Sequence, residues 1–142
     1  MIGLLSYLFD SLTTLANPSS AYGVGVYLER GHEDVTFPYV TFKLSYSYTN
    51  EDREDHMLDV DIWGNAITST DPTDIDAIER RIDGNGNRKA ATGMDGRKYY
   101  TSTGGLAART YREHRLMLPD PDEAIRRRRL RYRVITFDAT TS

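Results

Sequence analysis

The sequence predicts a single α+β domain, in which a mainly antiparallel β-sheet packs against two α-helices. Three observations predict this fold class. Two segments repeat apolar residues at helical spacing, five segments alternate as strands do, and 142 residues with 39% hydrophobic content suit one core. No internal repeat and no long linker divides the chain, so residues 1–142 are expected to form one domain.

The first 28 residues predict a helix followed by a strand. Residues 2–16 are amphipathic, with leucines and Phe9 recurring at three- and four-residue steps. Asn17-Pro18 ends the helix, because helical backbone is disfavoured for the residue before a proline. Residues 22–28 then alternate as in a half-buried strand, and a polar loop follows.

Two longer strands joined by a charged turn predict an antiparallel hairpin. The first strand begins at Pro38 and alternates through Tyr48. The second covers residues 58–62, with aliphatic side chains on one face and Asp59 and Asp61 on the other. The turn between them is polar and almost entirely charged, which suits an exposed connection.

A second helix is expected over residues 70–83. Asp71 can cap its start, Pro72 suits its first turn, and isoleucines line one of its faces. The sequence Gly-Asn-Gly-Asn at residues 84–87 ends it, because glycine and asparagine are the residues that most readily leave helical backbone.

The rest of the chain predicts a variable segment and two further strands. Residues 88–105 are rich in glycine and threonine, and they indicate either a weak hairpin through Tyr99 and Tyr100 or a mobile loop. Residues 108–118 and 125–137 alternate as strands, and the two Pro-Asp pairs between them are a strong turn signal.

Charge divides unevenly along the chain, although the formal net charge is only −3. Residues 1–87 carry 15 acidic and 5 basic side chains, whereas residues 88–142 carry 6 acidic and 13 basic ones. Such a division is typical of a nucleic-acid footprint, or of a self-assembling subunit with two complementary surfaces. Composition alone leaves both interpretations open.

The arginine-rich last strand is the most distinctive local feature. Residues 126–133 hold six arginines, and their alternation with apolar residues predicts one exposed row. Phosphate contact is one interpretation, since guanidinium groups bind phosphate in a bidentate manner. Few aromatic residues accompany the arginines, so we favour a solvated face, or pairing with acidic segments 51–55 and 71–79 of a neighbouring copy. The candidate subunit or partner contacts are then Glu51, Asp52, Glu54, Asp55, Arg127, Arg129, Arg131 and Arg133.

Asp59 and Asp61 permit a metal-site interpretation. They share one strand face and present the oxygen ligands that Mg²⁺ prefers, but His56 has the opposite parity and would face away. The solvated face of a hairpin accounts for the same residues. We favour that interpretation and predict neither a metal nor a cofactor.

No pattern in the sequence indicates catalysis, and we expect no enzymatic activity. The absence of cysteine excludes disulfides, thiolate zinc sites and cysteine nucleophiles. His32 and His114 have no serine or acid at a recognisable catalytic spacing.

Neither a membrane-spanning segment nor a signal peptide is expected. No apolar run approaches the roughly 18 residues that span a bilayer. The apolar N-terminal stretch lacks a basic region, and Asp10 interrupts it. We therefore expect a soluble domain without a membrane partner.

The order of elements and several short strings resemble the tail-terminator, or tail-completion, proteins of long-tailed bacteriophages. The resemblance begins with the N-terminal helix and strand and continues through Phe37–Phe42 and the charged hairpin. It then takes in Leu58–Trp63 with its Val-Asp-Ile-Trp ending, a helix like Pro72–Ile82, and the closing strand Arg129–Phe137. The pattern covers most of the chain and includes no catalytic signature.

This resemblance implies a small α+β subunit that assembles as a ring, commonly a hexamer. Such a ring sits on the head-proximal end of the tail tube, stops tube polymerisation and presents a surface for head–tail joining. The implied partners are further copies of the chain, the tail-tube protein and the head–tail connector or head-closure protein. DNA would pass through the lumen without specific binding, and the implied location is the virion tail after assembly in the host cytoplasm.

Three other functions stay open at this point. A head–tail connector or head-closure protein of the phage neck would share the ring principle but face the other partner. A nucleic-acid-binding module using Arg126–Arg133 would bind with a steep dependence on salt, and the acidic first 87 residues disfavour it. A metal-dependent enzyme at Asp59 and Asp61 ranks last.

Overall fold

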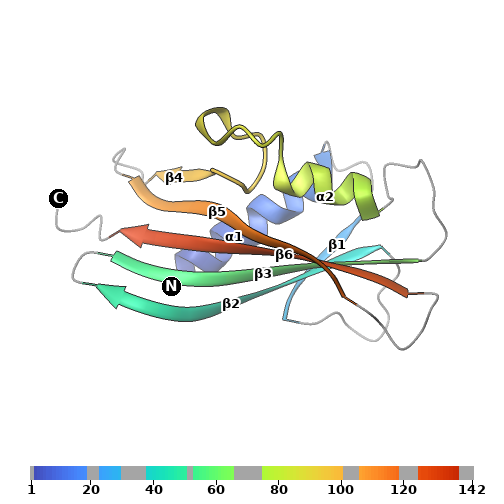
Figure 1. The fold of residues 1–142 in the computed structure, drawn as a ribbon, viewed down its shortest axis with the longest axis horizontal. Helices are drawn as coiled ribbons and strands as arrows, with labels where there is room; N and C mark the ends of the chain where they lie inside the picture. Colours follow the sequence, from blue (N-terminus) through green and yellow to red (C-terminus); the bar gives the residue numbers. More distant parts are fainter. Residues whose placement is uncertain are drawn as a thin grey trace.

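In the computed structural model of the chain, six strands form one curled mixed sheet, and both helices pack on the same face of it (Figure 1). The structure describes residues 2–18, 23–29, 38–50, 53–65, 75–100, 106–118 and 125–137. This arrangement confirms the expected α+β fold class and the expected single domain.

The elements follow one another in the order that the sequence pattern predicts, with additional short elements after the second helix. Their bounds are α1 Ile2–Ala16, β1 Gly25–Leu28, β2 Tyr39–Asn50, β3 Arg53–Asn65, α2 Ile75–Asp83, the 3₁₀ turn η2 Arg88–Ala90, β4 Lys98–Tyr100, β5 Leu106–Leu118 and β6 Ile125–Phe137.

The order of strands across the sheet is β1-β2-β3-β6-β5-β4. Strands β2 and β3 form the expected antiparallel hairpin, and β5 and β6 form a second one. These two hairpins join along β3 and β6, which are far apart in sequence but pair over their whole length, from Arg53 opposite Phe137 to Asn65 opposite Ile125. Among the described strands, only β1 and β2 pair in parallel, which the alternation of residues 22–28 did not predict.

Helix α1 packs against the β1–β2 half of the sheet through leucines spaced four residues apart. Leu8 and Leu12 are fully buried, whereas Phe9, which belongs to the same predicted apolar stripe, is 42% exposed. The helix ends at Ala16. The side chain of Asn17 then binds both the N–H and the C=O of Val24, at 2.6 and 2.7 Å, and so ties the helix end to the start of β1.

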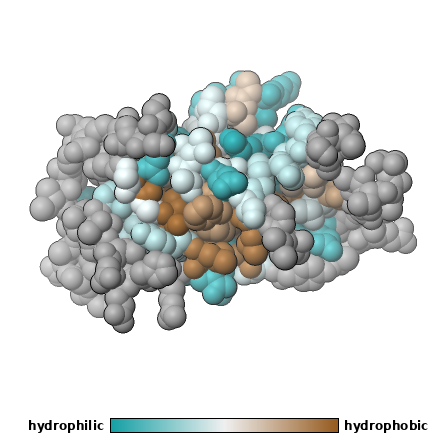
Figure 2. All heavy atoms as spheres, turned by 180° about the vertical axis from the view of Figure 1, so that it is seen from behind, coloured by the Kyte–Doolittle hydropathy of each residue, from teal (hydrophilic) through white to brown (hydrophobic). Residues whose placement is uncertain are grey.

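A group of apolar side chains reaches the surface beside α1. Phe9 and Leu28 are 42% and 47% exposed, and both adjoin Phe42, which is buried. Viewed from the side opposite to that of Figure 1, hydrophobic side chains gather near the middle of the molecule (Figure 2). This side therefore presents apolar surface as well as charge.

Helix α2 packs on β3 and β6, on the same sheet face, with Ile75, Ile78 and Ile82, which are buried as predicted. The expected starting residues Asp71 and Pro72 lie outside the described residues.

The chain leaves α2 at Gly84, whose φ of +98° is a left-handed conformation that favours glycine. It then folds back so closely that a Cβ on Gly93 would lie 2.5 Å from the backbone of residues 82–84. Further on, β4 pairs antiparallel with β5 through Tyr99 and Tyr100, which is the hairpin rather than the loop of the two alternatives.

No helix in the described part of the chain is both long enough and apolar enough to span a membrane.

Candidate interaction surface

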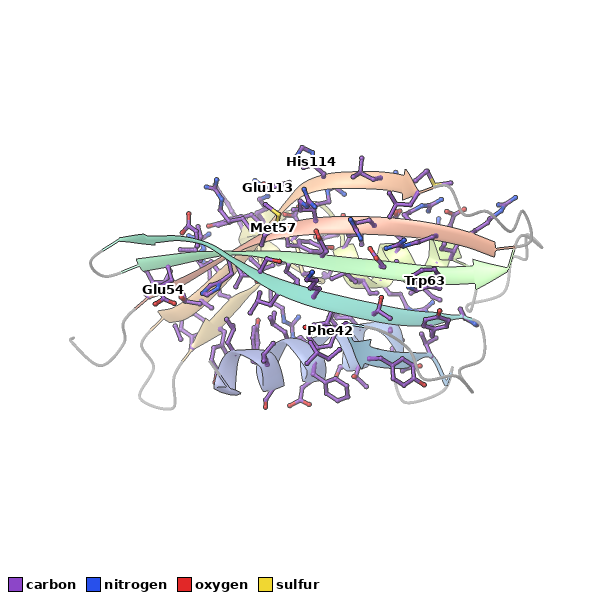
Figure 3. The ribbon with its side chains drawn as sticks, turned by 90° about the horizontal axis from the view of Figure 1, so that it is seen from below. Phe42, Glu54, Met57, Trp63, Glu113 and His114 are labelled. Atoms are coloured by element: carbon purple, nitrogen blue, oxygen red, sulfur yellow. The ribbon has the colours of Figure 1, made fainter. Side chains whose placement is uncertain are left out.

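The sheet face opposite the helices carries the acidic and basic residues that the sequence singled out. Residues Leu58, Val60 and Ile62 of β3 point toward the helices and are fully buried. The alternate residues of β3 and β6 therefore point to the other face, which we call the outer face. Figure 3 shows the molecule from below the view of Figure 1, with Met57 and Trp63 on β3 and Glu113 and His114 on β5.

A ladder of ion pairs joins β3 to β6 across the outer face. In the strand register Asp59 lies opposite Arg131, and Asp61 lies opposite Arg129. Arg131 Nε donates to Asp59 Oδ1 at 2.8 Å, and Arg129 Nε donates to Asp61 Oδ1 at the same distance. Arg127 adds a bond from Nη2 to Asp61 Oδ2 at 2.5 Å. Asp61 therefore binds two guanidinium groups, both from β6.

These pairs shift the ionisation of their members. Burial opposes the charged form of Asp61, but the hydrogen bonds from Arg129 and Arg127 outweigh it, so the pKa of the Asp61 carboxyl lies below its ordinary value. The hydrogen bond to Asp61 raises the pKa of Arg129, and the bond to Asp59 raises the pKa of Arg131. Asp61, Arg129 and Arg131 are therefore charged at neutral pH.

An aromatic cluster continues the outer face from β6 to the edge strand β1. The guanidinium carbon of Arg127 lies 4.4 Å from the ring centroid of Trp63, which is within cation–π range. Trp63 stacks on Tyr39 at 5.7 Å, and Tyr39 meets Tyr27 edge to face at 6.2 Å. Trp63 Nε1 also donates to Thr41 Oγ1 at 3.1 Å. Four strands are thus joined by side chains on this face.

Four acidic residues were predicted as contacts in the turn after β2, and the two that the structure describes differ in exposure and in their partners. Glu51 and Asp52 lie outside the described residues. Glu54 has a 42% exposed side chain, and one of its carboxylate oxygens lies 3.3 Å from His56 Nε2. Asp55 is buried and lies 4.0 Å from Arg133 Nε, which pairs more closely, at 2.9 Å, with Glu113 of β5.

The exposed arginine row is present, and its partners are in the same chain. Arg127, Arg129, Arg131 and Arg133 all lie on the outer face, as their alternation predicts, and each has an acidic residue of β3 or β5 within 4.0 Å. Pairing with acids of a neighbouring copy is therefore not needed to neutralise them. The sequence did not identify these partners within the chain, because it did not place β6 beside β3.

The metal-site interpretation of Asp59 and Asp61 finds both carboxylates on one face, as expected, but bound to guanidinium groups. His56 points to the other face, where it is 1% exposed. In the ranges that the structure describes, no cluster of three or more metal-ligating side chains occurs.

A second polar network lies on the helix face and was not predicted from the sequence. The hydroxyl of Tyr132 donates to Asp83 Oδ1 at 2.9 Å, and Arg112 donates to Asp83 Oδ2 at 2.5 Å. Burial, and then the charge of Asp83, raise the pKa of Tyr132 well above its ordinary value. Asp95 accepts from Arg112 N at 2.8 Å and from Arg88 Nε at 3.0 Å. This network fixes the end of α2 and the segment after it to the sheet.

A neighbouring group of charges ties α2 to the same strands. Arg128 points to the helix face, where it binds Asp76 and lies 3.4 Å from Glu79. Arg115 Nε donates to Glu79 Oε1 at 2.6 Å. The sequence offered segment 71–79 as one possible partner for the arginines of a neighbouring copy; in the structure Asp76 and Glu79 have partners in the same chain.

No protein-family model matches this chain, and no curated protein matches it with significance.

Proposed function

We propose that this chain is a structural subunit of a bacteriophage tail that assembles into a ring, commonly a hexamer, and acts as a tail terminator. In this role the ring caps the head-proximal end of the tail tube, stops its polymerisation and offers the surface to which the head joins. The chain has no catalytic part in this process.

One observation carries the proposal. The three strings on which the family resemblance depends are separated along the chain, yet they occupy adjacent strands: Pro38–Phe42 enters β2, Leu58–Trp63 lies in β3, and Arg129–Phe137 lies in β6. Their side chains meet in the ion-pair ladder and the aromatic cluster of the outer face. The segments that carry the resemblance therefore form one continuous surface, which supports a role in assembly.

The charge arrangement favours this proposal over nucleic-acid binding through Arg126–Arg133. Arg127, Arg129 and Arg131 are already bound to aspartates of β3. A phosphate would have to compete with these short ion pairs. Because the aspartates already neutralise the arginines, binding would release few counterions from the nucleic acid.

The test is to mix the purified chain with polymerising tail-tube subunits encoded by the same genome and to image the products. A terminator is expected to bind one end of each tube and to shorten the tubes as its concentration rises. Tubes that lengthen freely with bare ends would contradict the proposal, and binding to head-connector rings instead of tubes would assign the chain to head closure.

A further inference from the structure

Both outer edges of the sheet are capped over part of their length. On β5, backbone groups of residues 96–97 bond to Thr110 N and O at 2.9 and 2.6 Å. Two residues further on, side chains take over this role: Asp95 accepts from Arg112 N at 2.8 Å, and Arg88 donates to Arg112 O at 3.1 Å. The edge of β5 is therefore occupied as far as Arg112.

Beyond Arg112 the described part of the chain leaves the edge of β5 open. Residues 114–118 pair with β6 on one side, and no described strand pairs with them on the other. Residues 114–117 are exposed, and Met117, which lies opposite Arg128 on the helix face, is 64% exposed. An open edge with exposed apolar side chains is a template for a further strand.

The opposite edge of the sheet has the same construction. Asn17 caps the backbone of Val24 on β1 through two bonds. Glu29 N donates to Phe42 O of β2 at 2.7 Å, so the alternate residues Val26 and Leu28 direct their backbone groups away from β2. No described strand lies on that side of β1.

The surfaces beside the two open edges complement one another. At β1, Leu28 and Phe9 present apolar area, and Asp10 and Glu29 present exposed carboxylates. At β5, Met117 presents apolar area beside the ion pair of Arg128 with Asp76, in which Asp76 is the exposed member, and beside further arginines. The side chains of Arg112 and Arg115 are 39% and 53% exposed, whereas their acidic partners are only 11% and 9% exposed.

The direction of the strands also fits. Strand β1 is parallel to β2, and the antiparallel steps from β2 through β3 and β6 leave β5 antiparallel to β1. In Figure 3 the C-terminal half of β5 (orange) and β1 (blue) lie on opposite sides of the sheet, toward the same end of it. A neighbouring copy rotated about an axis along the strands would bring β1 beside β5 as an antiparallel pair.

We propose that the open edge of β5, at His114–Leu118, pairs with the open edge of β1, at Gly25–Leu28, of a second copy of this chain. The inference rests on the proposed ring and names the contact that builds it. Each subunit offers one edge and accepts the other, which is a head-to-tail contact that closes into a ring when the rotation permits. The sheet then runs continuously from subunit to subunit through backbone hydrogen bonds.

The test uses the absence of cysteine from the native chain. Leu28→Cys and Met117→Cys place single thiols on the same face of the two edges, as diagonal neighbours across the proposed antiparallel pair, within reach of a short bis-maleimide. After treatment with this reagent, a mixture of the two single variants is expected to give a cross-linked dimer. Neither variant alone should cross-link, and the double variant should give a ladder of covalent oligomers.

A matched control replaces Met117→Cys by Tyr100→Cys, which puts a thiol at a 52% exposed site on β4, away from the proposed contact. This pair is expected not to cross-link. A ring-sized mass without a 28–117 cross-link would overturn the edge contact and leave the ring proposal standing. Dimers of one single variant would show a two-fold contact instead. Monomers without any cross-link at all concentrations would contradict both proposals.

Discussion

Replacing Asp61 by alanine is expected to lower the free energy of unfolding by about 3 kcal/mol, because breaking a buried ion pair leaves its partner uncompensated. Asp61 is 6% exposed and accepts hydrogen bonds from both Arg127 and Arg129. Its removal would leave two guanidinium groups, each only about a quarter exposed, with like charges close together. Chemical denaturation of both proteins measures the difference.

Asp59→Ala provides the matched control on the same strand face. Asp59 is more exposed, it binds Arg131 at 2.8 Å, and Arg129 lies 4.0 Å away. Arg129 retains Asp61 when Asp59 is lost. We therefore expect a loss of about 1 kcal/mol for Asp59→Ala. Equal losses for the two variants would contradict the central position of Asp61.

Acidity should act through the same residue. The pKa of Asp61 is lower in the folded protein than in the unfolded chain, so its contribution to stability is present above the ordinary aspartate pKa. That contribution is lost as the pH falls through the folded-state pKa. Stability should therefore decline more steeply with acid in the native protein than in Asp61→Asn, which has no carboxylate to protonate.

Replacing Tyr132 by alanine is expected to cost about 4 kcal/mol of unfolding free energy, in the range measured for large aromatic side chains in cores. Tyr132 is completely buried, and its hydroxyl binds Asp83. The variant leaves a cavity between β6 and the helices and removes one of the two donors of the buried Asp83 carboxylate. Denaturant unfolding of both proteins measures the difference. The slope of unfolding free energy against denaturant concentration should be the same for both.

Tyr132→Phe separates the contribution of the hydroxyl to stability from that of the ring. Its expected cost is about 1 kcal/mol, because the ring stays and only the hydrogen bond is lost. Since burial and Asp83 raise the pKa of Tyr132, the native protein should also lose stability as the pH rises above about 10, the ordinary tyrosine value. The phenylalanine variant should lack this alkaline contribution. An alanine variant no less stable than the phenylalanine variant would contradict the core position of the ring.

Much of the fold follows from local patterns in the sequence. Asn17-Pro18 ends α1, and the isoleucines of α2 face the core. The alternation along β3 places Leu58, Val60 and Ile62 on the helix face, and it places Asp59 and Asp61 on the outer face. These features depend on residues a few positions apart, so single-sequence periodicity is sufficient to predict them.

The neighbours of each strand depend on pairing across long stretches of chain, which periodicity does not report. The sequence predicted both β3 and β6 but not their contact, which joins residues about 70 positions apart. The aspartate partners of Arg129 and Arg131 in the same chain were consequently not predicted, and a solvated face or pairing with another copy was expected instead. Trp63, whose stacking with Tyr39 and Arg127 completes the outer face, also becomes a site residue only when β2, β3 and β6 lie side by side.

The central claim is that copies of this 16.2 kDa chain close into a ring. Native mass spectrometry over a range of protein concentrations tests it most directly. The account predicts one discrete assembly near six times the subunit mass, in exchange with monomer and without a continuous series of larger species. A monomer at every concentration, or open-ended polymers without a preferred size, would contradict it.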